Sequence, residues 1–439
     1  MSAPAPGARR IRVFLTGAAV LSLTMLLVSG ANYLLNFALA RMLDPAGFGD
    51  ATLAITLVLS AAIIAATLQM VAARSAAAQP EIGPALRRSL VRAAIVIGLV
   101  SAVLLGGGAW TLAAALHTTT PWMFVIIGVG LPVYFAQAVH RGLLQGALRF
   151  PRLAATYLAE AIVRVGVVLV LVAAGWGVIG ASLGILLSFL AAGAVAWTRP
   201  VRQRPRAKIP RRTLRATMAG AVVMLMAQTL LNNADLVLAK AAFEPAAAGV
   251  YAAAAVLCRS LYFVSWSIVQ AVVPVLAGES TTATERRRAG VLAFSLISAL
   301  GAVAILLAAT VGGAAVDLLF GREYAAAVPL LVPYTAATAL LSLSTLLAAT
   351  DVARGRRVGP LILMGGALVQ VLVLLAAGHT PPSMAWLQVA ATALTLAALV
   401  IVFLVRAPRL RPTPVLVRAH PETTPIPTAV PARAEQRSS

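Results

Sequence analysis

The chain of 439 residues is 61% hydrophobic and only 11% charged, whereas soluble globular domains are about half apolar and about a quarter charged. This composition excludes a soluble domain as the main part of the protein and predicts helices that span a membrane. The formal net charge of +22 does not indicate a nucleic-acid partner, because the basic residues stand between apolar runs instead of forming one face.

Clusters of charged residues, proline and glycine divide the apolar sequence into twelve predicted membrane-spanning helices. Each is long enough for a hydrocarbon core about 30 Å thick, which needs about 20 residues. The spans cover about residues 13–40, 48–73, 91–116, 121–146, 153–174, 177–198, 215–239, 247–277, 290–319, 325–349, 359–378 and 383–405. The first apolar run is too long for a signal peptide. The predicted fold class is therefore an all-α polytopic membrane protein.

The distribution of basic residues predicts the orientation of these spans. With the N-terminus in the cytoplasm, 30 of the 35 Lys and Arg residues fall on the cytoplasmic side, including Arg141 near the inner end of the fourth span. The exceptions are Arg41, Lys240 and Arg322 outside, and Arg164 and Arg259 within spans. The positive-inside rule therefore favours cytoplasmic termini. We expect a bacterial cytoplasmic (inner) membrane protein.

A basic, proline-rich segment divides the spans six and six and predicts the domain organisation. The N-terminal six-helix lobe would cover residues 1–198, and residues 199–214 would form a cytoplasmic linker. The C-terminal six-helix lobe would cover residues 215–406. Residues 407–439 are rich in Pro, Thr and Arg, which predicts a disordered cytoplasmic tail near anionic lipid.

The two halves carry the same short pattern at a shift of about 200 residues. The corner "LARMLDPAGFGD" in the first half returns as "LAKAAFEPAAAGVY" in the second. The matched pairs are Asn36 and Asp235, Arg41 and Lys240, Asp44 and Glu244, Pro45 and Pro245, Gly49 and Gly249, Gln69 and Gln270, and Tyr134 and Tyr334. Six spans return the chain to its starting side, so this pattern predicts a parallel duplication with a pseudo-twofold axis along the membrane normal.

Several segments together resemble one family. They are the repeated corner, "LQMVAAR" at the end of the second span, "RGLLQGALRFPRLA" from Arg141, and "LLNNADLVLAKAAFEPAAAGVYAAAAVLCRSL" from Leu230. The chain is similar to the polysaccharide-type flippases, the repeat-unit translocases of the multidrug/oligosaccharidyl-lipid/polysaccharide exporter superfamily, which also contains the MATE transporters. The resemblance implies two lobes around a V-shaped central cavity.

The resemblance also implies a function. The polysaccharide branch flips polyprenyl-diphosphate-linked oligosaccharides from the cytoplasmic to the outer leaflet by alternating access, for cell-surface polysaccharide assembly. The alternative within the same fold is a multidrug or metabolite exporter coupled to H⁺ or Na⁺. The short outer loops leave little room for the catalytic groups of a membrane glycosyltransferase, so we expect no enzymatic activity. Expected partners are membrane lipids, a polysaccharide polymerase and glycosyltransferases, and we expect a monomer.

Two arginines within the membrane are candidate substrate-binding residues. Glu160 and Arg164 lie four residues apart in the fifth span, which favours an ion pair within the helix. We expect Arg164 to contact the lipid diphosphate, and Glu160 to orient it or to carry a coupling proton; mutual neutralisation is the alternative. Arg259 has no acidic residue within a helical turn. It is a predicted second anion contact, or else part of a structural bond between lobes.

Polar residues near the outer ends of the first and seventh spans are further candidates. The asparagines are Asn36, Asn232 and Asn233, which we expect to bind sugar hydroxyls. Asp235 is a candidate for holding a coupling cation, with an ion pair to Lys240 or a bond across helices as the alternative. Asp50 stands at the start of the second span, where an acid complements the helix dipole.

Cysteine and histidine usage argues against metals and cofactors. The single cysteine, Cys258, lies in an apolar run, so disulfides and cysteine-ligated clusters are excluded. The four histidines lack the spacing of a metal site, and the sequence has no GxxxxGK[ST] phosphate-binding loop. We expect no cofactor, no bound metal and no ATP-driven step.

Overall fold

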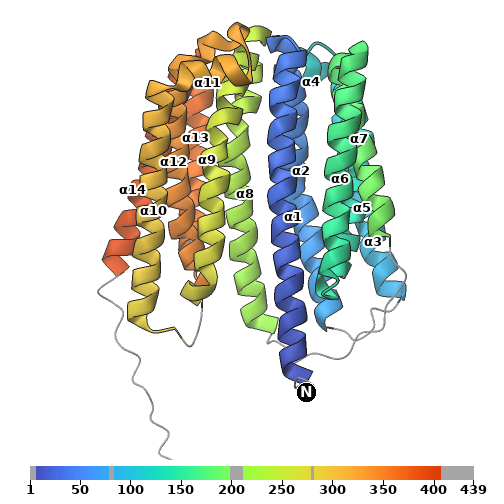
Figure 1. Cartoon of the computed structure of the whole chain (residues 1–439), viewed down its shortest axis with the longest axis vertical. Coiled ribbons are helices and arrows are strands. Elements are labelled where there is room, and N and C mark those ends of the chain that lie inside the picture. The colour runs from blue at the N-terminus through green and yellow to red at the C-terminus, as the bar shows by residue number, and fades with distance from the viewer. Residues whose placement is uncertain (1–5, 79–83, 198–210, 278–280, 407–439) are drawn as a thin grey trace, which may run out of the picture.

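A computed structural model describes residues 6–78, 84–197, 211–277 and 281–406, which form helices and no strands. Figure 1 shows the helices as one upright bundle. The helices are α1 (Pro6–Met42), α2 (Pro45–Ala78), α3 (Pro84–Gly107), α4 (Ala109–Ala115), α5 (Trp122–Gly146), α6 (Phe150–Leu171), α7 (Gly177–Ala196), α8 (Arg211–Ala242), α9 (Pro245–Ala277), α10 (Ala283–Thr310), α11 (Gly312–Leu319), α12 (Val328–Ala353), α13 (Val358–Ala377) and α14 (Pro381–Arg406). A π-helical segment, Val172–Trp176, follows α6, and a 3₁₀ segment, Arg322–Ala327, precedes α12.

The described chain contains eleven segments long and apolar enough to cross a membrane, which confirms the predicted all-α polytopic fold class. One of them, Phe150–Ala196, is 47 residues long, more than twice the roughly 20 residues that a bilayer requires. The chain turns within it at Gly175, whose φ of +87° is a conformation that glycine adopts readily. Figure 1 accordingly shows α6 and α7 side by side. The count of twelve spans stays a prediction.

Two predicted spans are wrong at their outer ends. The expected helix 91–116 breaks at Gly108, where ψ is 4°, so α3 ends and the short α4 begins. The expected helix 290–319 breaks in the same way at Val311, again with ψ of 4°, which separates α10 from α11. A ψ near zero takes these residues out of the α-helical range. The matching breaks follow the repeat that the sequence predicts.

The predicted linker and tail fall mostly outside the described residues. Residues 198–210 and 407–439 are not described. α8 begins at Arg211, within the predicted linker 199–214, and its apolar span begins at Val222, so the bounds of the linker stay a prediction. Arginine is a good helix former, so a basic stretch continues a helix as readily as it forms a linker.

Helices from the two halves of the chain meet along α2. This helix packs against α5 of its own half and against α8 and α9 of the other half, whereas α1 packs mainly against α6. Figure 1 places α3, α5, α6 and α7 to one side of α1, and α9 to α14 to the other. This arrangement suits a division into two lobes. The bounds of those lobes stay a prediction.

The repeated corner lies where the halves touch most closely. A Cβ atom added to Gly49 would lie 3.1 Å from the Cα atom of its matched residue, Gly249. A Cβ atom added to Gly249 would overlap the carbonyl oxygen of Pro45. Contact between a residue and its own repeat counterpart is what a twofold axis between the halves would produce. Small residues at such a crossing let two helix backbones approach each other.

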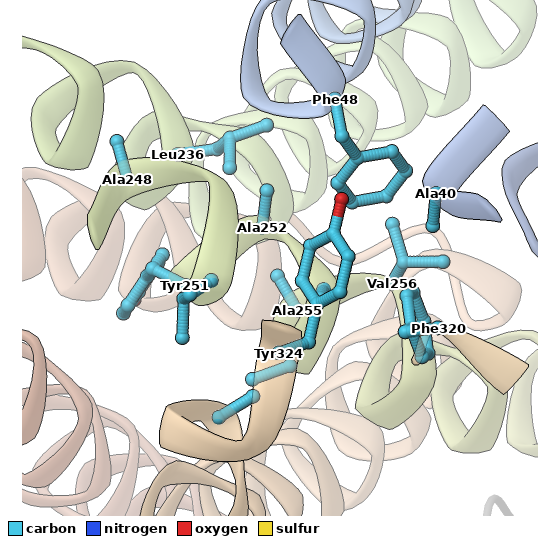
Figure 2. Packing of buried hydrophobic residues seen from close by; sticks show 14 of the residues in the cluster. Ala40, Phe48, Leu236, Ala248, Tyr251, Ala252, Ala255, Val256, Phe320 and Tyr324 are labelled. Atoms are coloured by element: carbon cyan, nitrogen blue, oxygen red, sulfur yellow. The ribbon is translucent and has the colours of Figure 1, made fainter. Parts of the chain in front are cut away.

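The largest buried apolar cluster lies at the same end of the molecule, where α1 and α8 finish and α2 and α9 begin; we call this the corner end, at the top of Figure 1. Phe48 packs edge-to-face on Tyr324 and Phe320, with ring centroids 5.7 and 6.0 Å apart. Figure 2 shows these rings beside residues of α8 and α9. The clusters around Phe135 and Met224 draw their residues from one half each. Apolar packing between halves is therefore concentrated at the corner end.

We expect Gly249→Ala to lower the melting temperature of the purified protein in detergent. The added methyl group meets the Pro45 backbone, and such overpacking costs about 1–3 kcal/mol. Gly30→Ala is the matched control, because an added Cβ there has no atom within 4 Å, and alanine favours a helix over glycine. Equal melting temperatures for the two variants would contradict a close contact between α2 and α9.

Candidate functional site

A buried carboxylate with two arginines lies in the first half. Glu160 on α6 accepts a hydrogen bond from Nη2 of Arg141 on α5, with 2.6 Å between Nη2 and Oε2. Its other oxygen pairs with Arg164, one turn further along α6. Glu160 is buried and Arg164 is nearly so. Two guanidinium groups on one carboxylate leave this cluster with a net charge of +1.

Arg141 is a site residue that the sequence analysis missed, because it was counted among cytoplasmic basic residues. The structure buries it within α5. Its Nε donates to Oγ1 of Thr156 at 2.9 Å, and its Nη2 donates to the Thr156 carbonyl oxygen at 3.0 Å. Its guanidinium carbon lies 4.0 Å from the ring centroid of Tyr157, a cation–π distance. One sequence feature does place Arg141 within the helix. The five residues that follow it, to Gly146, are uncharged and continue the helical segment.

Arg164 also reaches a different helix. Its Nη1 donates to Oδ1 of Asn32 on α1 at 3.4 Å. Its Nε is buried without a hydrogen-bond partner. A buried guanidinium donor without a partner is uncommon in proteins and favours a ligand at that place. Arg164 is therefore held by Glu160 while it retains a free donor. The same holds for Nε of Arg259, so what distinguishes Arg164 is the excess positive charge of its cluster.

A second buried carboxylate lies in the other half and is neutralised. Oδ1 of Asp235 on α8 is 2.6 Å from Nη2 of Arg259 on α9. Its Oδ2 accepts hydrogen bonds from the hydroxyls of Tyr334 at 2.5 Å and Tyr251 at 3.2 Å. Gln388 donates in turn to the Tyr251 hydroxyl at 3.0 Å. This cluster has one negative and one positive charge.

This pairing alters two sequence expectations. Arg259 has no acidic residue within a turn of its own helix, but Asp235 reaches it from the neighbouring helix. The alternative pairing of Asp235 with Lys240 is wrong. Residues five apart on an α-helix lie about 140° apart around its axis, so the two side chains point to different faces.

Lys240 instead forms an ion pair between the halves. Its Nζ lies 2.6 Å from Oδ1 of Asp50 on α2, and both side chains are 0% exposed. Oδ2 of Asp50 accepts hydrogen bonds from the backbone N–H and the hydroxyl of Thr119, each at 2.7 Å. Asp50 directly follows Gly49 at the corner end. The sequence assigns Asp50 no role beyond a complement to the helix dipole, and it does not predict this contact.

The three predicted sugar-binding asparagines each bond to their own helix. In each, the side-chain Nδ2 donates to the backbone carbonyl oxygen four residues earlier. These bonds are Asn36 to Asn32 at 2.8 Å, Asn232 to Gln228 at 2.9 Å, and Asn233 to Thr229 at 2.9 Å. Asn232 is also hydrogen-bonded to the side chain of Tyr262. An amide that donates one N–H to its own helix keeps a second N–H and its Oδ1 atom as potential partners. Asn36 is linked to Arg164 through Asn32, which bonds to both residues. The sugar-binding role of the three asparagines stays a prediction.

The helices and the buried charge clusters define a multi-pass membrane protein with polar groups at membrane depth. A model described as "Polysaccharide biosynthesis protein" matches residues 14–278, more than half of the chain. The chain therefore belongs to the polysaccharide biosynthesis protein family. The matched region contains Arg141, Glu160, Arg164, Asp235 and Arg259.

Sequence relatives come from mycobacteria. An uncharacterized protein of Mycobacterium bovis is 29% identical over 275 residues, which cover 60% of this chain and 62% of the relative. An uncharacterized protein of Mycobacterium tuberculosis is 28% identical over 274 residues, with the same two coverages. The chain thus matches less than two thirds of the length of these relatives.

Solved structures share the fold at low identity. A multidrug resistance MATE family transporter of the MOP superfamily, in an inward-facing conformation, superimposes with a TM-score of 0.66 at 13% identity, covering 89% of this chain and 98% of that one. The lipid II flippase MurJ, in an inward closed conformation, gives 0.69 at 9% identity, covering 88% and 87%. The family match and the fold together confirm the predicted resemblance to the multidrug/oligosaccharidyl-lipid/polysaccharide exporter superfamily.

We expect Lys240→Met to lower the melting temperature strongly, because it leaves the Asp50 carboxylate buried without its cation. Breaking a buried pair on one side costs about 3–5 kcal/mol. The double variant Asp50→Asn/Lys240→Met should recover most of the loss, since it removes both charges and keeps an acceptor for Thr119. Thermal unfolding in detergent measures both. A double variant as unstable as the single one would show that the charge pair is not the cause.

Proposed function

We propose that this protein is a flippase that moves a polyprenyl-diphosphate-linked oligosaccharide from the cytoplasmic to the outer leaflet for cell-surface polysaccharide assembly. The observation that carries the proposal is the pair of arginines, Arg141 and Arg164, on the single carboxylate of Glu160. Membership of the polysaccharide biosynthesis protein family and the shared fold support it.

The electrostatics of the cluster favour an anionic substrate group. A charge at the bilayer centre costs at least about 2.5–3.5 kcal/mol, and Glu160 can offset only one of the two guanidinium charges. A diphosphate would offset the other, and its oxygens suit the planar fork of arginine. Glu160 and Asn32 hold Arg164 from two sides while its Nε remains free for such a ligand. The polyprenyl chain would stay in the lipid.

Contacts between the halves support alternating access. The Asp50–Lys240 pair and the apolar cluster around Phe48 join the halves at the corner end. In the orientation that the basic residues predict, this end faces outward, so the lipid would enter from the cytoplasmic side. Release would require the halves to separate at the corner end and would expose the ion pair to water.

The competing function, export of organic cations, has less support. A cation-binding site needs an accessible carboxylate, whereas Glu160, Asp235 and Asp50 each face an arginine or a lysine in the described chain. A coupling H⁺ or Na⁺ at Glu160 or Asp235 would have to displace one of these side chains. Glu160 and Asp235 remain coupling candidates if the ion displaces the paired arginine.

We further propose that the protein acts as a monomer in the bacterial cytoplasmic membrane, with both termini in the cytoplasm. Glycosyltransferases would supply its lipid-linked substrate and a polymerase would use its product, because a glycan must be assembled on its carrier before it is flipped. The proposal assigns no catalytic step to the protein itself.

We expect Arg164→Ala to reduce flipping of a fluorescent polyprenyl-diphosphate oligosaccharide in proteoliposomes at least tenfold. Loss of one charge-assisted hydrogen bond costs about 1.5–3 kcal/mol, and Glu160 keeps Arg141, so the fold should persist. Arg152→Ala is the matched control, because Arg152 on the same helix donates only to the backbone carbonyls of Val195 and Trp197 among its described hydrogen bonds. Normal flipping by Arg164→Ala, or transport of cationic dyes by the wild type, would contradict the proposal.

A further inference from the structure

A carboxamide cluster lies next to the arginines in the first half. Nε2 of Gln69 on α2 donates to Oε1 of Gln145 on α5 at 2.9 Å. The same Nε2 lies 3.2 Å from the hydroxyl of Tyr157 on α6. Three helices therefore bring two amides and a phenol to one place, although these residues are far apart in the sequence.

This cluster is continuous with the arginine cluster. The ring of Tyr157 lies under the guanidinium of Arg141, which in turn binds Glu160. Gln145 follows Arg141 by four residues on α5, which is about 6 Å along the helix axis. Gln145 therefore lies about one turn beyond Arg141, away from the corner end. In the predicted orientation this is the cytoplasmic side. Tyr157 lies about two turns from Arg164 on α6.

The closest contact of α5 with α2 is made by glycines and not by these amides. The close approach of α5 to α2 depends on Gly142 and Gly146, where an added Cβ would overlap the carbonyl oxygens of Gln69 and Ala73. The side chain of Gln145 is exposed, and those of Gln69 and Tyr157 are partly exposed. Exposed amides on membrane-spanning helices face water or a polar ligand more readily than lipid.

We propose that Gln69, Gln145 and Tyr157 form a subsite for the uncharged sugar that is attached to the diphosphate. The subsite rests on the proposed function, because it needs the diphosphate at Arg141 and Arg164. Carboxamides both donate and accept hydrogen bonds, as neighbouring sugar hydroxyls do. In the structure the two amides bond to each other, and a sugar would replace that bond with an equivalent set.

The described part of the second half provides a control glutamine. Gln270 on α9 is the repeat counterpart of Gln69 and is exposed. However, α12, the counterpart of α5, contains neither arginine nor glutamine along its whole length. Gln270 is therefore a glutamine at the matching position of the repeat, without an arginine or glutamine on α12 of the described chain to complete such a cluster.

The test measures binding of two lipids to the purified protein in nanodiscs. One lipid is a polyprenyl diphosphate that carries a short glycan, and the other is the same polyprenyl diphosphate without sugar. We expect Gln69→Ala and Gln145→Ala each to weaken binding of the glycan lipid about tenfold, the effect of losing one or two hydrogen bonds. Binding of the sugar-free lipid should not change. Tyr157→Phe, which keeps the ring under Arg141, should weaken only glycan binding, by a smaller factor.

The outcomes separate the subsite from the proposed function. Gln270→Ala should change binding of neither lipid, and all variants should keep the wild-type melting temperature. Equal weakening of both lipids by the Gln69 and Gln145 variants, or no weakening of either, overturns the sugar subsite and leaves the diphosphate site standing. If the wild type binds neither lipid, the proposed function itself is wrong, and the subsite with it.

Discussion

A charge inside a bilayer needs a partner, and this constraint shapes the structure. Three buried carboxylates, Glu160, Asp235 and Asp50, each meet a basic side chain in the described part of the chain. Two of the clusters balance, whereas the Glu160 cluster has one positive charge in excess. In a medium where a lone charge costs at least about 2.5–3.5 kcal/mol, that excess is a place for an anion. The same physics explains why few charged groups appear between the helix ends.

The two halves share a scaffold but differ in chemistry. The matched glycines touch at the corner end, and the breaks after α3 and α10 correspond. The charge clusters, however, use different helices: α5 and α6 in the first half, and α8 and α9 in the second. A duplicated bundle supplies two rigid bodies able to rock against each other, and later divergence of one half can place a binding site in it without disturbing the shared contact.

Hydropathy and the repeated corner were enough to predict the helical membrane fold, because backbone hydrogen bonding in lipid leaves few alternatives to helices. The pair Glu160–Arg164 was predictable because both residues lie on one helix, four positions apart. The sequence did not predict the contacts of Arg141, Asp50 and Arg259. Each of these contacts joins two different helices and depends on how the helices are rotated and how deep they lie. Spacing along one chain segment contains no information about which faces of two segments meet.

The most direct test of an anion site in the first half is a cryo-electron microscopy structure of the protein with bound polyprenyl diphosphate. We expect phosphate oxygens within hydrogen-bond distance of Arg164, with Glu160 still paired to Arg141. Phosphate density at Arg259 with Asp235 displaced, or a lipid bound with Arg164 turned away from its phosphates, would contradict it.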